Sequence, residues 1–271
     1  MKPTPPVALT IAGSDSGGGA GIEMDLKVFA ALGAFGTCAI TAITAQNTAG
    51  VRGAWEVPVE QITAQLEAVL DDIQVKSAKT GMLSSERIVR AVARVVRERG
   101  LAPLVVDPVV VAKDGSHLLS DEGIAAVRDE LVPLATVITP NVPEAEALSG
   151  VKIRSEEDLA AAAAKLRASG CNWVLVKGGH LGGPQVTDLL LGPDTEQALS
   201  SPRIPGGPFH GTGCALSAAI AAYLAQGFAL PEAVVQARSF LQQLIQSARA
   251  LGKGALVLHP TPPTTRNSTN G

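Results

Sequence analysis

The stretch that decides the fold runs from Val7 to Gly21 and reads VALTIAGSDSGGGAG. Its first part, Val7 to Ala12, is a short apolar run typical of a buried strand, and a glycine-rich turn follows directly. Open α/β sheets commonly bind ligands in the crevice outside the carboxyl ends of their strands. The stretch therefore predicts such a sheet, with a ligand-binding turn at the end of its first strand.

Two known phosphate-binding motifs do not fit this turn. A dinucleotide fingerprint needs a third glycine where Ile22 stands after Gly17 and Gly19. A Walker A loop is absent as well, because the only Gly-Lys pair, at 252–253, is followed by another glycine. The alternative interpretation is an ordinary tight turn, in which Asp25 would be only a favourable charge in the first turn of a helix.

The rest of the chain alternates strand-like runs with helical patterns. Such alternation predicts a mostly parallel sheet with helices on both faces, a three-layer α/β fold. The expected strands are Val7 to Ala12, Thr37 to Ala45, Leu104 to Pro108, Thr136 to Pro140 and Trp173 to Lys177. We expect one domain over residues 7–259, a flexible N-terminus at 1–6 and a disordered tail at 260–271, which is rich in Pro, Thr and Asn.

The expected helices have amphipathic spacing or terminal signals. Ser155 and Asp158 form a possible capping box before an alanine-rich helix, and Gly170 stands where that helix should stop. Apolar residues recur at helical spacing from Ile62 to Ile73, and three arginines lie opposite apolar residues between Ser84 and Arg99. Two further helices are expected at about Cys214 to Gln226 and Pro231 to Ala250.

Composition excludes several classes of partner. The net charge is −3, and no basic block could supply the phosphate contacts that nucleic-acid binding requires. The longest apolar run, Ala215 to Leu224, is too short to cross a bilayer as a helix. The cysteines, Cys38, Cys171 and Cys214, are widely spaced and lack a CxxC pair, which favours a reducing cytoplasm.

The strongest chemical signal is Gly211-Thr212-Gly213-Cys214, followed at once by an apolar helix. Glycines let successive N–H groups point into one space, and the helix dipole adds positive potential there, so this segment predicts a cradle for a phosphoryl group. A thiol at a helix start should ionise more easily than an ordinary one, and Cys214 could then accept a proton. The alternative is a buried structural cysteine, which we accept for Cys38 and Cys171.

Two acidic residues and one lysine follow strands at the same predicted edge of the sheet. Asp107 and Glu144 could hold magnesium, which needs only one or two carboxylates besides waters and nucleotide phosphates. Glu146 would point about 200° away from Glu144 on the same helix, and a solvated face suits it better. Lys177 offers a cation for phosphates, and its alternative is a surface lysine in a turn.

Taken in order, these motifs resemble the hydroxymethylpyrimidine and phosphomethylpyrimidine kinases of thiamine biosynthesis, which have the ribokinase-like fold. The resemblance covers about residues 7–258. It rests on the motifs Ala12 to Ile22, Asp25 to Lys27, Thr44 to Thr48, Lys79 to Leu83, Asp107 to Val109, Thr139 to Glu146, Val176 to His180 and Gly211 to Cys214.

The resemblance implies roles for particular residues. Pyrimidine contacts would fall on Gly13, Asp25, Gln46, Met82 and Val109. The nucleotide and magnesium positions would fall on Asn141, Lys177, Asp107 and Glu144, and the anion hole on Gly211, Thr212, Gly213 and Cys214. It further implies ATP as co-substrate and a homodimer. Sugar kinases and ordinary pyridoxal kinases of this superfamily have an Asp in place of Cys214.

Two rival functions stay open at this point. The first is a pyridoxal or pyridoxine kinase of the same fold, since some relatives with a cysteine in this cradle phosphorylate pyridoxal. The second is a non-catalytic pyrimidine-binding sensor, against which Cys214, Lys177 and both acidic residues are all present. A loop that closes over the substrate is also plausible near Gly115.

Overall fold

A computed structural model describes residues 4–110 and 118–261. The expected tail from 262 onward, the first three residues and the loop around Gly115 lie outside the described residues. The α-helices are α1 (Gly21–Ala31), α2 (Val59–Leu70), α3 (Glu86–Arg99), α4 (Asp121–Ala126), α5 (Val142–Ser149), α6 (Glu156–Ala168), α7 (Thr212–Ala225) and α8 (Leu230–Gln246). Short π or 3-10 segments are η1 (Val127–Leu131), η2 (Val132–Leu134) and η3 (Gly178–His180).

The central sheet has eight strands in the order β10-β9-β8-β7-β6-β5-β1-β2. They are β1 (Val7–Ala12), β2 (Phe35–Ile40), β5 (Ser77–Thr80), β6 (Leu104–Val106), β7 (Val137–Ile138), β8 (Trp173–Val176), β9 (Gln185–Leu191) and β10 (Glu196–Pro202). All neighbouring strands from β2 to β8 pair in parallel, whereas β9 near one edge pairs antiparallel with both β8 and β10. The predicted α/β class with a mostly parallel sheet is confirmed.

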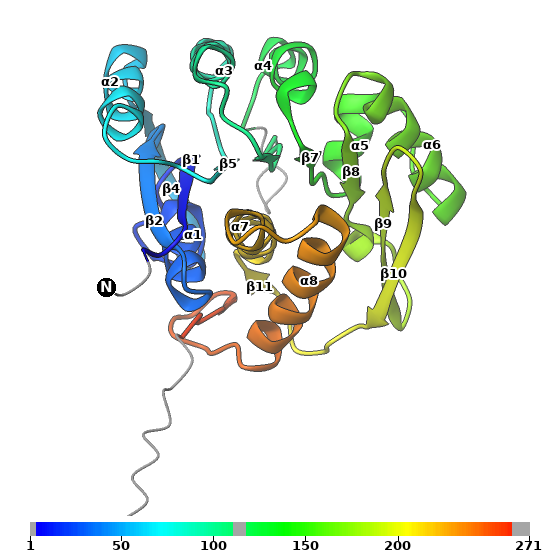
Figure 1. Ribbon diagram of the computed structural model, residues 1–271. Helices are drawn as coiled ribbons and strands as arrows, with labels where there is room; N and C mark the ends of the chain where they lie inside the picture. Colours follow the sequence, from blue (N-terminus) through cyan, green and yellow to red (C-terminus); the bar gives the residue numbers. More distant parts are fainter. Residues whose placement is uncertain (1–3, 111–117, 262–271) are drawn as a thin grey trace, which may run out of the picture.

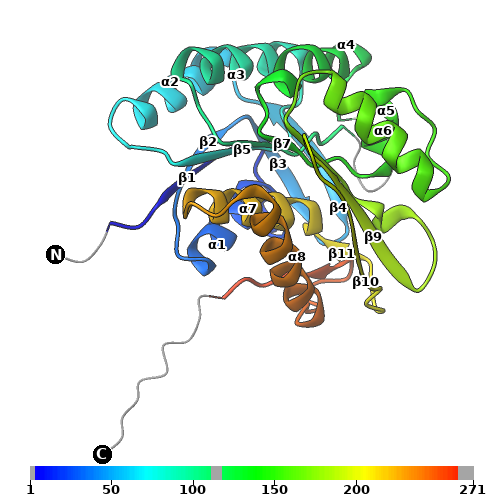
Figure 2. The same cartoon turned by 45° about the vertical axis from the view of Figure 1, so that its right-hand side comes forward.

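Helices cover both faces of this sheet (Figures 1 and 2). On one face, Leu9 and Ile11 of β1 join a buried cluster with α2, α3, α5 and α6. On the other face, Ala8 of the same strand joins a cluster with α1, α7 and α8. Alternate residues of one strand thus enter different cores, which is why the buried strands read as continuous apolar runs. This arrangement gives the three layers that the sequence predicts.

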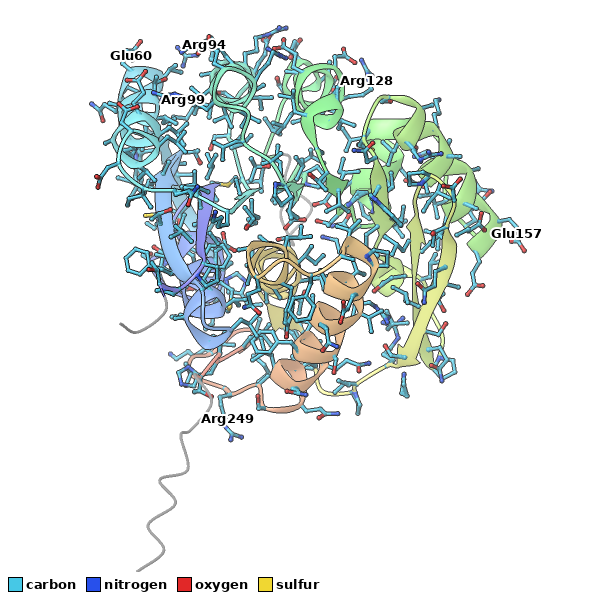
Figure 3. All side chains as sticks on the ribbon, viewed as in Figure 1. Glu60, Arg94, Arg99, Arg128, Glu157 and Arg249 are labelled. Carbon is cyan, nitrogen blue, oxygen red and sulfur yellow. The ribbon has the colours of Figure 1, made fainter. Side chains whose placement is uncertain are left out.

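The helix predictions hold well. Ile88, Val92 and Val95 of α3 are buried, and the arginines opposite them are exposed. Figure 3 shows labelled charged side chains, Arg94 and Glu157 among them, on the outer surfaces of the helical layer. The capping box of Ser155 and Asp158 is present, and α6 ends just before Gly170, whose φ is +113°. Among the described residues, no helix is long and apolar enough to cross a membrane.

The predicted strand from Thr37 to Ala45 is wrong in one respect, because the chain leaves the sheet at Thr41. There the Thr41 N–H donates to Ala12 O and its hydroxyl to Met82 O, which bends the chain away from β2. The following residues form β3 (Ala42–Asn47), which pairs antiparallel with β4 (Gly50–Glu56) as a separate ribbon. A further small pair is β11 (Phe209–His210) with β12 (Leu256–Val257).

Candidate active site

The site lies where the strand order reverses. From β1 the chain first adds β2 on one side and later adds β5 on the other, so the carboxyl ends of β1 and β5 flank a topological switch point. Gly13 follows β1 and its N–H donates to the carbonyl of Met82, which follows β5, at 3.1 Å. A Cβ at Gly13 would come within 2.4 Å of the Met82 Cε atom. Two predicted pyrimidine contacts are therefore brought together, and a side chain at Gly13 would require the end of the Met82 side chain to move.

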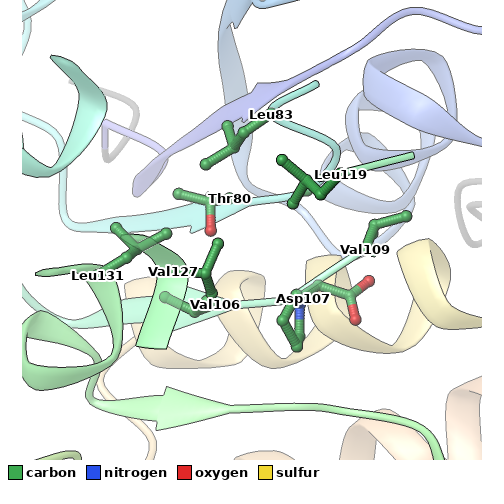
Figure 4. A pocket seen from close by; sticks show the side chains of 10 residues that line it. Thr80, Leu83, Val106, Asp107, Val109, Leu119, Val127 and Leu131 are labelled. Carbon is green, nitrogen blue, oxygen red and sulfur yellow. The ribbon is translucent and has the colours of Figure 1, made fainter. Parts of the chain in front are cut away.

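Asp107 and Lys177 form the centre of the predicted nucleotide end. Asp107 follows β6, and its Oδ1 accepts from Lys177 Nζ at 2.9 Å and from the Thr139 hydroxyl at 3.1 Å. Its Oδ2 accepts from the Ser217 hydroxyl of α7 at 3.1 Å. Figure 4 shows Asp107 and Val109 at a pocket over the ends of β5 and β6, whose other labelled side chains are apolar except for Thr80. Charged and apolar surfaces thus meet at this sheet edge.

The carboxyl groups of Asp107 and Glu144 titrate differently. Burial would raise the pKa of Asp107, but the nearby charges of Lys177 and Lys79 hold it below its usual value. Burial raises the pKa of Glu144 to about 7, even though Lys177 Nζ lies 4.0 Å from its Oε2. Burial therefore favours the neutral form of Glu144, whereas the neighbouring lysines favour the charged form of Asp107.

Asn141 and Glu144 are held together at the start of α5 by a capping box. The Asn141 side chain accepts from the Glu144 N–H at 2.9 Å, and Glu144 Oε2 accepts from the Asn141 N–H at 2.8 Å. A parallel bridge links Asn141 to Lys177, so both predicted nucleotide residues share one edge. Glu146 lies apart from them and accepts from the N–H of Ile153, as its separation from Glu144 around the helix predicts.

The predicted cradle, residues 211–214, forms the start of α7. Gly211 is the N-cap with a φ of +80°, and a Cβ there would come within 1.9 Å of Gly19 O. A Cβ at Gly213 would lie 3.3 Å from Lys177 Nζ and 3.6 Å from Asp107 Oδ2. The N-terminal end of α7 therefore packs against the first glycine-rich turn and faces the lysine and carboxylate that the sequence assigns to phosphate and metal.

Cys214 differs from the sequence expectation in its ionisation. Burial raises the pKa of the Cys214 thiol to about 11, although the Lys79 ammonium and the Gly21 N–H act in the opposite direction. The expected ease of ionisation at a helix start is therefore wrong for the protein without ligands. The desolvation of a buried thiolate outweighs the helix dipole.

Asp25 is not a surface charge in the first turn of α1. It is fully buried, and its Oδ2 accepts from Lys79 Nζ at 2.8 Å and from the Thr10 hydroxyl at 2.6 Å. Burial would lower the pKa of Lys79, but the charge of Asp25 raises it overall, so the lysine stays charged. Asp25 Oδ1 is buried without a hydrogen-bond partner among the described residues. This carboxylate oxygen could therefore accept a hydrogen bond from a bound ligand.

Gln46 lies on β3, outside the central sheet, whereas Asp25 lies on α1 and the other predicted contacts follow strands of the central sheet. One end of its amide lies 3.1 Å from His210 Nε2, and the same imidazole nitrogen lies 2.7 Å from Asp15 Oδ2. Because His210 directly precedes Gly211, this contact links the predicted pyrimidine contact to the cradle. The ribbon of β3 and β4 thus carries one of the five predicted pyrimidine contacts to the sheet edge.

A magnesium ion fits this arrangement. Asp107 and Glu144 both lie near one cation position, since Lys177 Nζ is 2.9 Å from the first carboxylate and 4.0 Å from the second. Two carboxylates together with nucleotide phosphates and waters match what magnesium prefers. Among the described residues, no three His, Cys, Asp or Glu side chains gather into a metal site of their own.

Sequence reasoning missed several members of the site. Lys79 belongs to the motif Lys79 to Leu83 but has no predicted role. A lysine within a short buried strand could have indicated a functional residue. Thr139 and Ser217, which donate to Asp107, gave no signal because hydroxyl residues are common in strands and helices. The capping box at Asn141 could have been predicted from its Asn-x-x-Glu spacing.

Solved structures with the same fold define the class of protein. A Bacillus subtilis pyridoxal kinase in an ADP complex matches with a TM-score of 0.88 and 37% identity, over 94% of this chain and 98% of that one. A phosphomethylpyrimidine kinase from Clostridium difficile matches with a TM-score of 0.79 and 41% identity, over 88% and 98% of the two chains. Together with the cradle, the lysine and the carboxylates, they define a kinase of the ribokinase-like fold.

Sequence comparison then gives the family. The sequence pattern of the phosphomethylpyrimidine kinases matches residues 15–259. The hydroxymethylpyrimidine/phosphomethylpyrimidine kinase of Streptomyces coelicolor is 49% identical over 251 residues, which cover 93% of each chain. The chain belongs to the phosphomethylpyrimidine kinase family. The fold and the family predicted from the motifs are confirmed.

Proposed function

We propose that this kinase transfers the γ-phosphoryl group of ATP to the hydroxymethyl group of 4-amino-5-hydroxymethyl-2-methylpyrimidine, and then phosphorylates the monophosphate to the diphosphate for thiamine biosynthesis. The observation that carries the proposal is the junction at Gly213, where the N-terminal end of α7 faces Lys177 and Asp107 within 4 Å of one glycine position. The Streptomyces relative is named for both activities. A time course followed by mass spectrometry tests this directly, since the monophosphate must rise before the diphosphate.

The acceptor would bind at the ends of β1, β3 and β5. Gly13, Met82 and Val109 supply close packing, while Gln46 and Asp25 supply polar contacts for an aminopyrimidine edge. The unpartnered Oδ1 of Asp25 supports this assignment, because an amino group would satisfy it. Since Asp25 is fully buried in the free protein, direct contact requires a local rearrangement on binding.

ATP would extend from the cradle toward α8. A cleft beside the antiparallel edge of the sheet is lined by apolar side chains that suit a nucleobase, together with Arg203 and Arg238. The apolar side chains include Ile204, Phe209, Leu241 and Ile245. Asp188, which also lines this cleft, accepts from the N–H of Gly178, the neighbour of Lys177. This bond places the cleft next to the phosphate end, and we assign the nucleobase of ATP to the cleft. Asn141 and Lys177 would then contact the phosphates.

The transfer would proceed in line. The hydroxymethyl oxygen forms a bond to the γ-phosphorus while the bond from that phosphorus to the ADP oxygen breaks, and the hydroxyl proton passes to a Cys214 thiolate. Backbone N–H groups of residues 211–213 and the charge of Lys177 stabilise the transferred group. When bound by Asp107 and Glu144, magnesium would neutralise charge on the nucleotide phosphates.

Replacing Cys214 by alanine should harm the first transfer far more than the second. Loss of a proton acceptor typically costs 10²- to 10⁴-fold, so we expect kcat on the hydroxymethyl acceptor to fall by at least about 10²-fold. The monophosphate needs no hydroxyl deprotonation, and its turnover should change little. Separate steady-state assays on each acceptor measure this difference. Equal losses on both acceptors would remove Cys214 from the role of base.

The raised pKa of Cys214 predicts a pH dependence with a definite sign. Only the thiolate accepts a proton, and below a pKa of about 11 its fraction grows about tenfold per pH unit. Between about pH 7 and pH 9, kcat on the hydroxymethyl acceptor should therefore rise with pH. In Cys214→Asp the base is already ionised at neutral pH, and the profile should be flat over this range. A flat profile in the unmodified enzyme contradicts the proposed proton transfer.

We further propose that the enzyme is a homodimer through the ribbon of β3 and β4. Ile43 and Trp55 are paired across this ribbon and are 55% and 60% exposed, an unusual position for two large apolar side chains. Trp55→Lys should convert the dimer to a monomer in sedimentation velocity at micromolar concentration. Val235→Lys, at an exposed apolar position on α8, should leave the dimer intact. A monomeric unmodified protein, or a dimeric Trp55→Lys, would show that this ribbon is not the interface.

We place the enzyme in the cytoplasm, whose reducing conditions suit its free cysteines Cys38, Cys171 and Cys214.

A second candidate function, phosphorylation of pyridoxal, is favoured by the match to the Bacillus subtilis pyridoxal kinase at 37% identity. Comparing kcat/KM for the pyrimidine and for pyridoxal separates the two functions.

A further inference from the structure

Three residues that are not among the predicted substrate contacts form a hydrogen-bonded group around Gln46. It comprises Asp15 of the glycine-rich turn, His210 before the cradle, and Thr44 beside Gln46 on β3. One imidazole nitrogen, His210 Nε2, lies 2.7 Å from Asp15 Oδ2 and 3.1 Å from one end of the Gln46 amide. The other end of that amide lies 3.3 Å from the Thr44 hydroxyl. Both ends of the amide are therefore engaged.

Asp15 determines whether His210 Nε2 carries a proton. Its carboxylate accepts three backbone N–H groups, those of Gly17, Gly19 and Ala20, at 2.8 to 3.1 Å. Two of them share Oδ2 with the imidazole, so this oxygen is an acceptor and His210 Nε2 must carry the proton. The one proton on Nε2 is directed at Asp15, and a protonated Nε2 has no lone pair that could accept an amide N–H. The carbonyl oxygen of Gln46 is therefore the end that fits the 3.1 Å contact, where it shares this proton with Asp15 in a three-centre hydrogen bond.

Thr44 gives the same answer independently. Its single hydroxyl proton donates to the Ser14 carbonyl oxygen at 2.8 Å. The hydroxyl can then only accept from Gln46, so the amide nitrogen must lie on the Thr44 side. The protons available on His210 and on Thr44 therefore favour the same orientation of the Gln46 amide, with oxygen toward His210 and nitrogen toward Thr44. This is the reverse of the orientation assigned to the amide in the structure, where Nε2 faces His210 and Oε1 faces Thr44.

We propose that His210, held by Asp15, is a positioning residue that fixes the Gln46 amide for recognition of an aminopyrimidine. The inference rests on the proposed function and on Gln46 as a substrate contact. With both ends tied, the amide presents one N–H and one oxygen lone pair in a single order. An aminopyrimidine offers the complementary pair, an amino donor beside a ring-nitrogen acceptor. Pyridoxal has no amino group beside its ring nitrogen, so His210 would favour the pyrimidine selectively.

Close packing supports a dedicated place for this imidazole. A Cβ at Gly19 would lie 2.4 Å from His210 Cδ2, so any larger residue there must push the ring aside. The φ of Gly19 is outside the left-handed region, and alanine at that position is strained only by the imidazole. Gly19→Ala therefore displaces His210 without altering its chemistry.

A double-mutant cycle tests the proposal. His210→Leu removes the donor, and we expect KM for the hydroxymethylpyrimidine to rise about tenfold while KM for ATP stays unchanged. His210→Gln, which can place an N–H near the Nε2 position, should restore most of the loss, and Gly19→Ala should reproduce it. In a Gln46→Leu background, His210→Leu should add less than about twofold, because contacting residues are non-additive.

The outcomes are separable. Additive losses in the cycle, or equal losses for the pyrimidine and pyridoxal, would overturn the positioning role and leave His210 as a structural part of the cradle. Failure of the unmodified enzyme on the pyrimidine would instead overturn the proposed function. His259→Leu, which removes an exposed imidazole near the end of the described chain, is the matched control and should change neither KM.

Discussion

Gly211→Ala is expected to lower kcat by about 10²- to 10³-fold, the cost of losing a donor that stabilises a transition-state anion. The new Cβ would lie 1.9 Å from Gly19 O, so the N-terminal end of α7 must separate from the glycine-rich turn. The φ of +80° adds strain, because residues other than glycine rarely adopt it. The N–H groups that face Lys177 would then no longer converge on one phosphoryl group.

Gly227→Ala is a matched control for the backbone strain. Gly227 has a φ of +89°, but a Cβ there meets nothing within 4 Å, and the residue follows α7 at its far end. We expect it to lower the free energy of unfolding by about 1–2 kcal/mol while leaving kcat unchanged. Steady-state kinetics and urea unfolding measure both quantities. Similar losses of kcat in the two variants would mean that strain, not the cradle, limits turnover.

Lys177→Met should give the second large effect. The Asp107 and Glu144 carboxyl groups are 2% and 4% exposed, and the substitution removes the cation beside both. Breaking a buried ion pair by removing one partner typically costs about 3–5 kcal/mol, so the free energy of unfolding should fall by that order. The phosphoryl group also loses a positive charge in the transition state, and we expect kcat to fall by about 10²-fold or more.

Lys152→Met is the control for this substitution. Lys152 is 79% exposed and pairs with Glu146, so its loss should cost at most about 1 kcal/mol and leave kcat unchanged. Measurements of kcat and of unfolding on both variants separate the site from a general effect of lost charge. If Lys177→Met retained turnover, the lysine would not contact the transferred phosphoryl group or its nucleotide.

The positions of Asp107, Asn141 and Lys177 at one edge could be predicted because parallel strands end at the same side of a sheet. Each residue follows a short apolar run, which is a strong signal in the sequence. The strand β5 gave no such signal, since it is only four residues long and includes Ser77 and Lys79. Its lysine is tolerated inside the sheet because Asp25 neutralises it, a contact between distant residues that no local pattern reveals.

The chemistry of Cys214 and His210 depends on tertiary surroundings in the same way. A helix start lowers the pKa of a thiol in isolation, but desolvation by the surrounding elements reverses the shift for the half-buried Cys214. His210 stands beside the cradle in the sequence, yet its partners come from residues 15 and 46. Motif order indicated which segments form the site, whereas charge states and side-chain orientation required the fold.

The central claim is best tested by coupled ADP release with magnesium ATP and three acceptors in parallel: the hydroxymethylpyrimidine, its monophosphate and pyridoxal. The account predicts turnover of both pyrimidines, with a kcat/KM for pyridoxal that is far lower. A preference for pyridoxal would contradict it and favour a vitamin B6 kinase, and no turnover of any acceptor would contradict a catalytic role altogether.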